Sequence, residues 1–387
     1  MKIKTRQPNP IFMKEVEDLQ VLFPVDYWNR KSDEAAFPEE FWSEASRRKL
    51  PGFLIPQRYG GLGKTLTELV ETVIYLASHG CGTGLYPLLS NNMSSLVIMN
   101  SASEKLREEF LPKLASGDYV MGLAVTEKES GSDVLSIKTS AEKIRGKYVV
   151  KGEKMYVNNV DRATHMLLAV RTTPAERVAK KSDGISLFIV EFDRRRLKVE
   201  PLEKMGTNYF RTAAVVFDGV EVDEDFVVGE LDKGWKALTY ALNPDRIVYA
   251  ALAVGSAFFA IKTASNYARS RLVFGKPIGS YQGIQLPLAA HYSEAEAAKL
   301  LTLEAARKFD RRERTDVDAC LAKYLASEVA FKAVSVALQV LGGYGYLRES
   351  GLERVLRDVY LLKSGPITQE LALAYIAEKG LGLPRSY

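Results

Sequence analysis

The chain is short of cysteine, histidine and long apolar runs, and each shortage narrows what the protein can be. Its 387 residues include two cysteines, Cys81 and Cys320, which lie far apart and outside any Cys-x-x-Cys motif. They indicate neither a disulfide framework nor a thiolate metal site, so we expect a reducing, cytoplasmic location. The three histidines are isolated, which argues against a histidine-ligated metal centre or a catalytic triad. We therefore expect no metal site.

Signals for membranes and for nucleic acids are also weak. The longest apolar run, 247–261, has about 15 residues, whereas a membrane-spanning helix needs about 20. The first residues contain no apolar core of signal-peptide length. The net charge is +5, and acidic residues interrupt basic runs such as 308–314. We predict no membrane span and no nucleic-acid binding.

Periodicity divides the chain into three segments, and its length exceeds that of a usual single core. Apolar residues recur three and four apart up to residue 117, which is typical of helices. From 118 to 231 the period becomes two and β-branched residues accumulate with no helical run between them, which indicates an antiparallel barrel or sandwich. From 232 to 387 long helices return as a bundle. We expect helices at 39–50, 66–80, 103–117, 243–271, 284–312, 317–343, 352–363 and 368–380, and strands at 119–127, 148–160, 165–172, 185–192 and 213–222.

The glycine-rich stretch 59–65 (YGGLGKT) is not a phosphate-binding loop of the P-loop type. That loop needs a glycine five residues before Gly-Lys-Thr, and Arg58 occupies this position. No strand precedes the stretch, so we interpret it as a turn between helices.

Two motifs of the middle segment suit a flavin, although each also has an ordinary explanation. In 122–133 (GLAVTEKESGSD) a strand ends at Thr126, and the small polar loop that follows has N–H groups that suit an anion or a flavin edge. A common β-turn explains the same residues. In 152–159 (GEKMYVNN), Tyr156 and Asn158 project to one face of a strand. They suit the rim of a flavin ring, or a packed tyrosine beside a turn.

One motif of the last segment suits a pyrophosphate, and a second is a pair of glycines. Arg271, Phe274 and Gln282 cluster where a long helix ends, which also fits a helix cap with a solvated arginine. The pair Gly342 and Gly343 permits a close backbone approach, or simply ends a helix.

In their order and spacing, these motifs resemble the acyl-CoA dehydrogenase family over essentially the whole chain. The resemblance implies a helical N-terminal domain (1–117), a β-barrel middle domain (118–231) and a C-terminal four-helix bundle (232–387), an α+β multidomain fold. It also implies FAD between barrel and bundle, an acyl-CoA substrate, an electron-transfer flavoprotein as electron acceptor and a homotetramer. The matching stretches are AVTEKESGSD (124–133), GEKMYVNN (152–159), FRTAAVVFDGVEV (210–222), NPDR (243–246), YARSRLVFG (267–275) with the later Gln282, QVLGGYGY (339–346) and ERVLRD (353–358).

The same resemblance implies roles for individual residues. The family commonly has a tryptophan where Tyr156 stands, and Thr or Ser near flavin N5 where Asn158 stands. Residues expected on the flavin side are Val125, Thr126, Gly131, Ser132, Tyr156, Asn158 and, at the final turn, Thr368. Residues expected at the adenosine diphosphate half, partly from a neighbouring subunit, are Arg271, Phe274, Gln282, Gln339, Gly342 and Gly343. Residues expected to contact substrate are Ser132, Asn243 and Arg246.

The reaction that the family catalyses needs a carboxylate, and its usual position lacks one here. The base removes the α-proton while the β-hydride passes to the flavin, and the backbone N–H of the same residue helps to polarise the thioester carbonyl. In a gapless comparison this glutamate falls on Pro366, which has neither carboxylate nor N–H. A shift by one residue, to Gly365 or Ile367, restores the N–H but not the acid. Pro366 itself suits the first position of a helix.

Branched-acyl members of the family carry the base on the long bundle helix, directly before an arginine. The matching pair here is Asp245 and Arg246, and we predict that Asp245 is the base. The structural alternative takes Asn243, Pro244 and Asp245 as N-cap, N1 and N2 of a helix, where the dipole stabilises the carboxylate and weakens it as a base unless burial raises its pKa. Aspartate is also one methylene shorter than glutamate, which limits its reach.

Three functional hypotheses remain open at this point. The first is an FAD-dependent acyl-CoA dehydrogenase with a relocated base. The second is a flavin oxidase or monooxygenase on the same fold, and the third is a non-catalytic subunit that binds acyl-CoA or FAD. Tyr156, Asn158 and Pro366 depart from the family at the edge between flavin and substrate, which keeps the second and third open. The length and branching of the acyl chain do not follow from the sequence.

Overall fold

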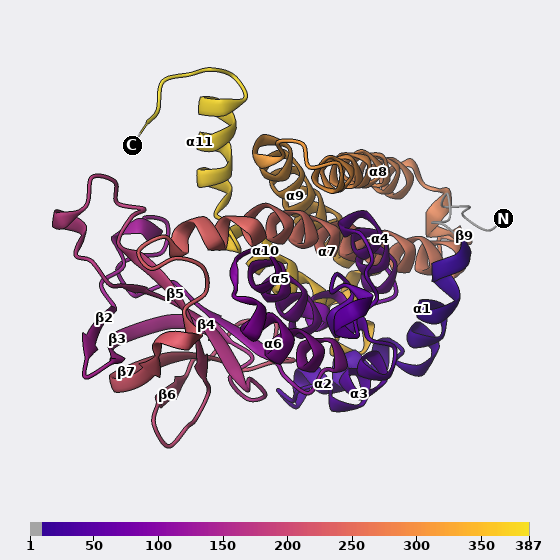
Figure 1. Cartoon of the computed structure of the whole chain (residues 1–387). Coiled ribbons are helices and arrows are strands. Elements are labelled where there is room, and N and C mark those ends of the chain that lie inside the picture. Colours follow the sequence, from indigo (N-terminus) through magenta and orange to yellow (C-terminus); the bar gives the residue numbers. More distant parts are fainter. Residues whose placement is uncertain (1–9, 387) are drawn as a thin grey trace.

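The structure, a computed structural model, describes residues 10–386, and it begins with a helical part (Figure 1). The expected helices α4 and α6 carry their own start and stop signals. Thr65 and Glu68 form a capping box at the start of α4, and α6 begins after the N-cap Ser103 and ends at Gly117 with φ +79°. The helices are α1 (Pro10–Leu22), α2 (Val25–Asp33), α3 (Glu39–Arg47), α4 (Leu66–Ala77), α5 (Tyr86–Ser101) and α6 (Glu104–Ser116).

Helix α5 was not expected from the sequence, and its burial explains why. Every residue from 87 to 98 is buried, so no polar face marks the helical period. Most of its polar side chains are paired instead. Asn92 accepts a hydrogen bond from Leu54 N at 3.0 Å, and Asn91 accepts one from Met121 N at 2.9 Å. These bonds fix α5 between the N-terminal helices and the sheet.

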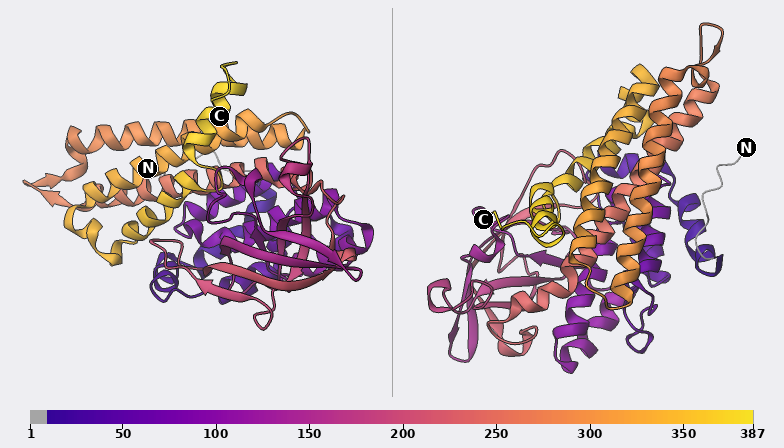
Figure 2. Two further views of the ribbon diagram at one scale, coloured as in Figure 1. Left: turned by 90° about the vertical axis from the view of Figure 1, so that its left-hand side faces the viewer. Right: turned by 90° about the horizontal axis from the view of Figure 1, so that it is seen from above.

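The middle part is a seven-stranded curled sheet that lies at one end of the molecule (Figures 1 and 2). The order is β1-β4-β2-β3-β7-β6, and β5 also pairs with β4. Most pairs are antiparallel, as expected, but β4 is parallel to β1, where Met121 lies opposite His165, and to β2, where Ser140 lies opposite Arg171. The β1–β4 pair is possible because a long crossover, with the β2–β3 hairpin, joins these two strands. The strands are β1 (Met121–Ala124), β2 (Ser140–Ile144), β3 (Lys147–Asn158), β4 (His165–Arg171), β5 (Ile185–Glu191), β6 (Lys198–Pro201) and β7 (Thr212–Asp223).

Helices α7 to α10 form the bundle, and α11 packs against α9 (Figure 1). At 37 residues, α7 is roughly 55 Å long and runs from the sheet to the β8–β9 hairpin at the far end of the bundle (Figure 2). The elements are α7 (Gly234–Ser270), β8 (Leu272–Val273), β9 (Lys276–Pro277), α8 (Gln282–Asp310), α9 (Asp316–Leu341), α10 (Leu352–Ser364) and α11 (Gln369–Lys379).

Two of these helices are long and apolar enough to cross a membrane by length and composition. They are Gly234–Ser270 and the stretch Asp316–Tyr346, and 83% and 50% of their most apolar windows are buried inside the protein. The apolar run 247–261 considered in the sequence lies inside the first of these helices, which continues past Arg246 on one side and Lys262 on the other. Burial inside the bundle accounts for the apolar character of α7.

The start of α7 contradicts one expectation from the sequence. The helix begins at Gly234, so Pro244 lies inside it and Asp245 is not an N2 residue. Gly234 sits tightly on strand β5, where a Cβ would lie 2.5 Å from Leu187 N. This contact between Gly234 and β5 explains why the helix starts well before Pro244. Pro244 removes one N–H donor from the helix but does not begin it. The argument that a helix N-terminus weakens Asp245 as a base is therefore wrong.

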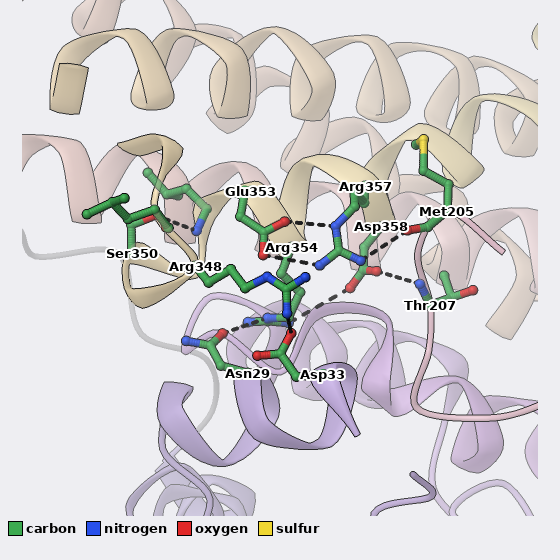
Figure 3. A network of polar contacts seen from close by, with 12 residues as sticks. Asn29, Asp33, Met205, Thr207, Arg348, Ser350, Glu353, Arg354, Arg357 and Asp358 are labelled. Atoms are coloured by element: carbon green, nitrogen blue, oxygen red, sulfur yellow. Dashed lines mark hydrogen bonds and ion pairs between the residues drawn. The ribbon is translucent and has the colours of Figure 1, made fainter. Parts of the chain in front are cut away.

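A buried polar network joins the three parts of the chain (Figure 3). Arg354 of α10 donates to Asn29 Oδ1 at 2.8 Å, to Gly80 O at 2.7 Å and to the Tyr209 hydroxyl. Asp358 accepts from Thr207 N at 2.6 Å and from the Tyr209 hydroxyl at 3.2 Å. The network therefore fixes the 205–210 loop against α2 and α10. Phe210, the next residue after Tyr209, reaches the site described below.

Candidate active site

Asp245 lies on α7 where the bundle meets α5 and the end of β3. It is the only carboxylate in the 37 residues of this helix, and it is half-buried. Burial raises the pKa of Asp245 from 3.8 to about 7, and Arg246 partly opposes this rise. A carboxylate with a pKa near neutrality is suited to accept a proton at physiological pH. Of the expected site residues, Asp245 is thus the one whose surroundings favour acid–base chemistry.

Two other residues of its motif, Asn243 and Arg246, stay close to it. Arg246 Nη1 donates to Asn243 Oδ1 at 2.8 Å within the same helix. Behind Arg246 lies Lys323 of α9, which is buried and donates to Lys363 O at 2.9 Å. Burial lowers the pKa of Lys323 to about 8. Lys323 thus lies close enough to Arg246 for the two positive charges to interact.

Two tyrosines, which the sequence did not indicate, complete the surroundings of Asp245. Tyr249 is one turn further along α7, and Tyr86 is the first residue of α5. Burial raises the pKa of both hydroxyls, that of Tyr86 to about 12, and the negative charge of Asp245 adds to the rise. The i, i+4 spacing from Asp245 to Tyr249 was the one signal available in the sequence. Nothing local marked Tyr86, because its place depends on the packing of the unexpected helix α5.

Asn158 joins this group from the end of β3. Its amide nitrogen donates to the Tyr86 hydroxyl at 2.8 Å, and its oxygen accepts from Thr212 Oγ1 at 2.7 Å. The ring of Tyr86 stacks on Phe210 with centroids 4.7 Å apart. The structure therefore links Asn158, expected on the flavin side, to the surroundings of Asp245 through one tyrosine.

The 364–368 turn, which holds Pro366, packs against the same group. A Cβ at Gly365 would lie 3.6 Å from the ring of Tyr249. The N–H of Gly365 already donates to Leu361 O at 2.9 Å, so a shift by one residue does not make it a free donor. Pro366 is exposed. It was expected to be the first residue of a helix, but α11 begins after it. Thr368 is the N-cap and accepts from Leu371 N at 3.2 Å, which leaves Pro366 two residues before the cap.

A buried ion pair holds the loop that contains Val125 and Thr126. Lys154 is fully buried and donates to Glu127 Oε1 at 2.8 Å and to Val125 O at 2.9 Å. Glu127 also accepts from the backbone N–H groups of Lys138 and Thr139, at 2.7 and 2.9 Å. These bonds lower the pKa of Glu127 against the effect of burial. The pair thus connects both ends of the 125–139 loop to β3.

The same pair supports the bulge that carries Tyr156. Pairing with β7 is interrupted between Lys154 and Val157, and Tyr156 adopts φ +58° with 61% of its surface exposed. A bulge of this kind redirects a side chain out of the sheet. Gly131 and Ser132 are exposed, and a Cβ at Gly131 would meet nothing within 4 Å. This face of the loop and strand is open to a planar ligand.

The residues expected at the adenosine diphosphate half gather at the opposite end of the bundle. Arg271, Phe274, Gly342 and Gly343 line one cavity of about 940 Å³, with Tyr267 and Tyr344 stacked beside it at 5.9 Å. Gly342 and Gly343 leave open space where a Cβ would stand. The remaining two expected residues, Gln282 and Gln339, are exposed on α8 and α9, the helices that flank the cavity.

The two halves of the expected FAD site are far apart within one chain. About 26 residues of α7 separate Asp245 from Arg271, which amounts to roughly 39 Å along the helix. Each half by itself fits its part of FAD, because one presents an exposed aromatic ring and a small-residue loop and the other an arginine beside a glycine pair. The protein residues present therefore fit the cofactor, but as two separate parts of the molecule.

Models of three acyl-CoA dehydrogenase domains match the chain. The N-terminal domain matches residues 20–118, the middle domain 122–220 and the C-terminal domain 232–381. Acyl-CoA dehydrogenase FadE12 of Mycobacterium tuberculosis is 32% identical over 364 residues, which cover 94% of this chain and 93% of that protein.

Solved structures of this kind superpose over nearly the whole chain. A glutaryl-coenzyme A dehydrogenase in complex with glutaryl-CoA has a TM-score of 0.91 at 29% identity and covers 96% of this chain and 95% of its own. The prolyl acyl carrier protein oxidase AnaB has a TM-score of 0.90 at 26% identity and covers 97% and 100%. The chain belongs to the acyl-CoA dehydrogenase family and has its three-part fold, its FAD cofactor and its oxidoreductase chemistry on the CH–CH bond of acyl-CoA thioesters.

Proposed function

We propose that this enzyme dehydrogenates its acyl-CoA with Asp245 as the catalytic base. The observation that carries the proposal is the placement of a half-buried carboxylate, with its pKa raised to about 7, beside the residues that line the turn of Pro366. A carboxylate oxygen of Asp245 takes the α-proton, and the electron pair of the broken Cα–H bond becomes the Cα–Cβ double bond. The chemistry that FAD supplies is acceptance of the hydride from Cβ.

The neighbours of Asp245 have distinct tasks in this proposal. The nearby Arg246 limits the rise in the pKa of Asp245, so that the carboxylate is largely ionised above pH 7. Asn243, which Arg246 holds at 2.8 Å, and Ser132 of the 125–139 loop contact substrate. Val125, Thr126, Gly131, Tyr156 and Asn158 hold the flavin ring, and Thr368 caps α11 where the turn meets the cofactor.

A second subunit supplies the other half of each FAD site in this proposal. Arg271 and the Gly342–Gly343 pair lie roughly 39 Å from Asp245 along α7, so the two halves in one chain serve different cofactors. Phe274, Gln282 and Gln339 belong to the same remote half. Phe274 is 92% exposed in the single chain, which suits a residue covered by a partner. A homotetramer in the cytoplasm completes the proposal.

The electron acceptor separates the leading function from its alternatives. In the leading function an electron-transfer flavoprotein reoxidises the enzyme. The likeness to the oxidase AnaB, together with the loss of carboxylate and N–H at Pro366, favours an oxidase as the second candidate. A non-catalytic subunit that binds acyl-CoA or FAD is the third.

One experiment distinguishes the three. The yellow holoenzyme is mixed without oxygen with short, branched and longer acyl-CoAs, and its flavin absorbance is followed. Bleaching by a thioester, followed by faster reoxidation with electron-transfer flavoprotein than with air, is the expected result. Rapid reoxidation by air assigns an oxidase, and a flavin that no thioester bleaches assigns the binding subunit.

A further inference from the structure

The hydroxyl groups of Tyr86 and Tyr249 form an unusual pair beside Asp245. The two rings meet edge to face with centroids 6.0 Å apart, and the two hydroxyls lie against each other. The oxygen of Tyr86 already accepts a hydrogen bond from the Asn158 amide at 2.8 Å. Thr212 fixes the orientation of that amide by donating to its oxygen at 2.7 Å. Asn158 and Thr212, both on the sheet, therefore fix the position of the Tyr86 hydroxyl by hydrogen bonds.

At least one of the two hydroxyl protons of Tyr86 and Tyr249 has no hydrogen-bond acceptor in the described part of the chain. Two phenol groups carry two O–H protons, and a hydrogen bond between the two hydroxyls uses at most one of them. Within residues 10–386 no acceptor is bonded to the other proton, and Asp245 makes no hydrogen bond to either hydroxyl. Both hydroxyls stay protonated at neutral pH, because burial raises the pKa of each. A buried donor without an acceptor is unfavourable, so a ligand that supplies one gains affinity.

The position of this donor indicates which part of a substrate it meets. This placement of the donor relative to the substrate rests on the proposed function. There Asp245 faces Cα, and Asn158 stands beside the flavin position that receives the hydride from Cβ. The hydroxyl that Asn158 holds then lies on the side of Cβ, away from the thioester. Phe210, which is buried and stacks on Tyr86, adds an apolar ring to the same wall. The wall is thus apolar, with one hydrogen-bond donor in it.

We infer that the natural acyl group carries an oxygen beyond its β-carbon, which accepts a hydrogen bond from the Tyr86–Tyr249 pair. An ether, hydroxyl or carbonyl oxygen satisfies the donor, whereas a plain alkyl chain buries it without a partner. A site built around a donor discriminates against an analogue that lacks the acceptor. The two tyrosines are specificity residues, and Asn158 and Thr212 position them.

The test compares ether and alkyl thioesters of the same length. The pairs are 4-methoxybutanoyl-CoA with hexanoyl-CoA, and 5-methoxypentanoyl-CoA with heptanoyl-CoA, in which an oxygen replaces a methylene. Flavin reduction without oxygen yields the ratio of ether to alkyl efficiency, and calorimetry yields the ratio of dissociation constants. We expect an ether preference of about fivefold or more in at least one pair, the factor of one net hydrogen bond. We expect Tyr86→Phe and Tyr249→Phe to bring the ratio close to one.

A control variant and two contrary results complete the design. Tyr148→Phe removes a hydroxyl from a tyrosine that packs on Phe188 inside the sheet, and the wild-type ratio should persist in it. Equal handling of ether and alkyl chains by the wild type overturns the inference, and so does an ether preference that survives both tyrosine variants. If no thioester reduces the flavin, the proposed function fails. The ratio of dissociation constants then still decides whether the donor recognises an oxygen.

Discussion

Replacement of Lys154 by methionine tests whether one buried ion pair organises the flavin side of the site. The substitution keeps the volume and apolar stem of the side chain but removes the charge that faces Glu127 at 2.8 Å. Removal of one partner from a buried pair costs about 3–5 kcal/mol. Glu127 keeps two backbone N–H donors, from Lys138 and Thr139, which offset part of this loss. We expect the free energy of unfolding to fall by about 2–4 kcal/mol.

The pH dependence of this loss has a defined sign. In the wild type the pKa of Glu127 is below 4.5, so its contribution to stability is present above that pH and is lost as the pH falls through the folded value. Without Lys154, burial dominates and the pKa of Glu127 rises above 4.5. The variant then takes up a proton on folding in mildly acidic solution. The stability difference from wild type should therefore shrink below about pH 5.

Urea unfolding followed by tryptophan fluorescence measures the loss, and the absorbance ratio of flavin to protein measures FAD retained per chain. We expect Lys154→Met to lose FAD more readily, because Val125 loses a donor and the 125–139 loop loses its link to β3. The double variant Glu127→Gln, Lys154→Met removes the unpaired charge and should recover at least about 1 kcal/mol. A single variant as stable as wild type that retains its FAD would refute the reasoning.

Three further substitutions follow from the structure. Arg354→Met leaves Asp358 buried without its cation and should lower the free energy of unfolding by about 3–5 kcal/mol in urea titration. Thr368→Ala removes the N-cap of α11 and should lower it by about 1 kcal/mol, whereas Thr368→Ser should not. Asp245→Asn should raise it by about 1–3 kcal/mol at pH 8, because the wild type loses stability as Asp245 ionises between pH 4 and 7. That gain should vanish near pH 4, and a gain that persists there would contradict the burial of the carboxylate.

The sequence predicted the elements that carry a visible pattern. Helix α6 begins after Ser103 and ends at Gly117 as its signals indicated, and the bundle helices begin and end within a few residues of expectation apart from α7. Helix α5 was not predicted because it is buried on all sides. Strands β2 and β6 were not predicted because they are short and mostly exposed. The early start of α7 depends on Gly234 packing against β5, a contact that no local signal reveals.

The residues of the candidate site also fall into two groups, those that the sequence indicated and those that only the packing reveals. Its motifs led to Asp245 and Asn158 because these residues stand at positions that the spacing of the family's motifs marks. Tyr86 joins them only through the packing of α5 on α7, and Lys154 acts through a contact with a loop 27 residues away in sequence. The proline that displaces the usual base was visible in the sequence, but the bond from Gly365 N to Leu361 O, which removes one replacement donor, was not.

The assignment of Asp245 as the base is tested most directly by flavin reduction in carboxylate variants. The rate of bleaching by an acyl-CoA that reduces the wild type is measured without oxygen from pH 5 to 9 in Asp245→Asn, Asp245→Glu and Glu370→Gln. Glu370 is the matched control, because it is an exposed carboxylate close to the same turn, on α11.

The wild-type rate should rise with pH through about 7, in line with the pKa of Asp245. Asp245→Asn should lose this rise and at least about 100-fold in rate, the usual contribution of a general base, while Asp245→Glu retains a pH-dependent rate. Glu370→Gln should behave as the wild type. Normal reduction in Asp245→Asn, or its loss in Glu370→Gln alone, would contradict the account.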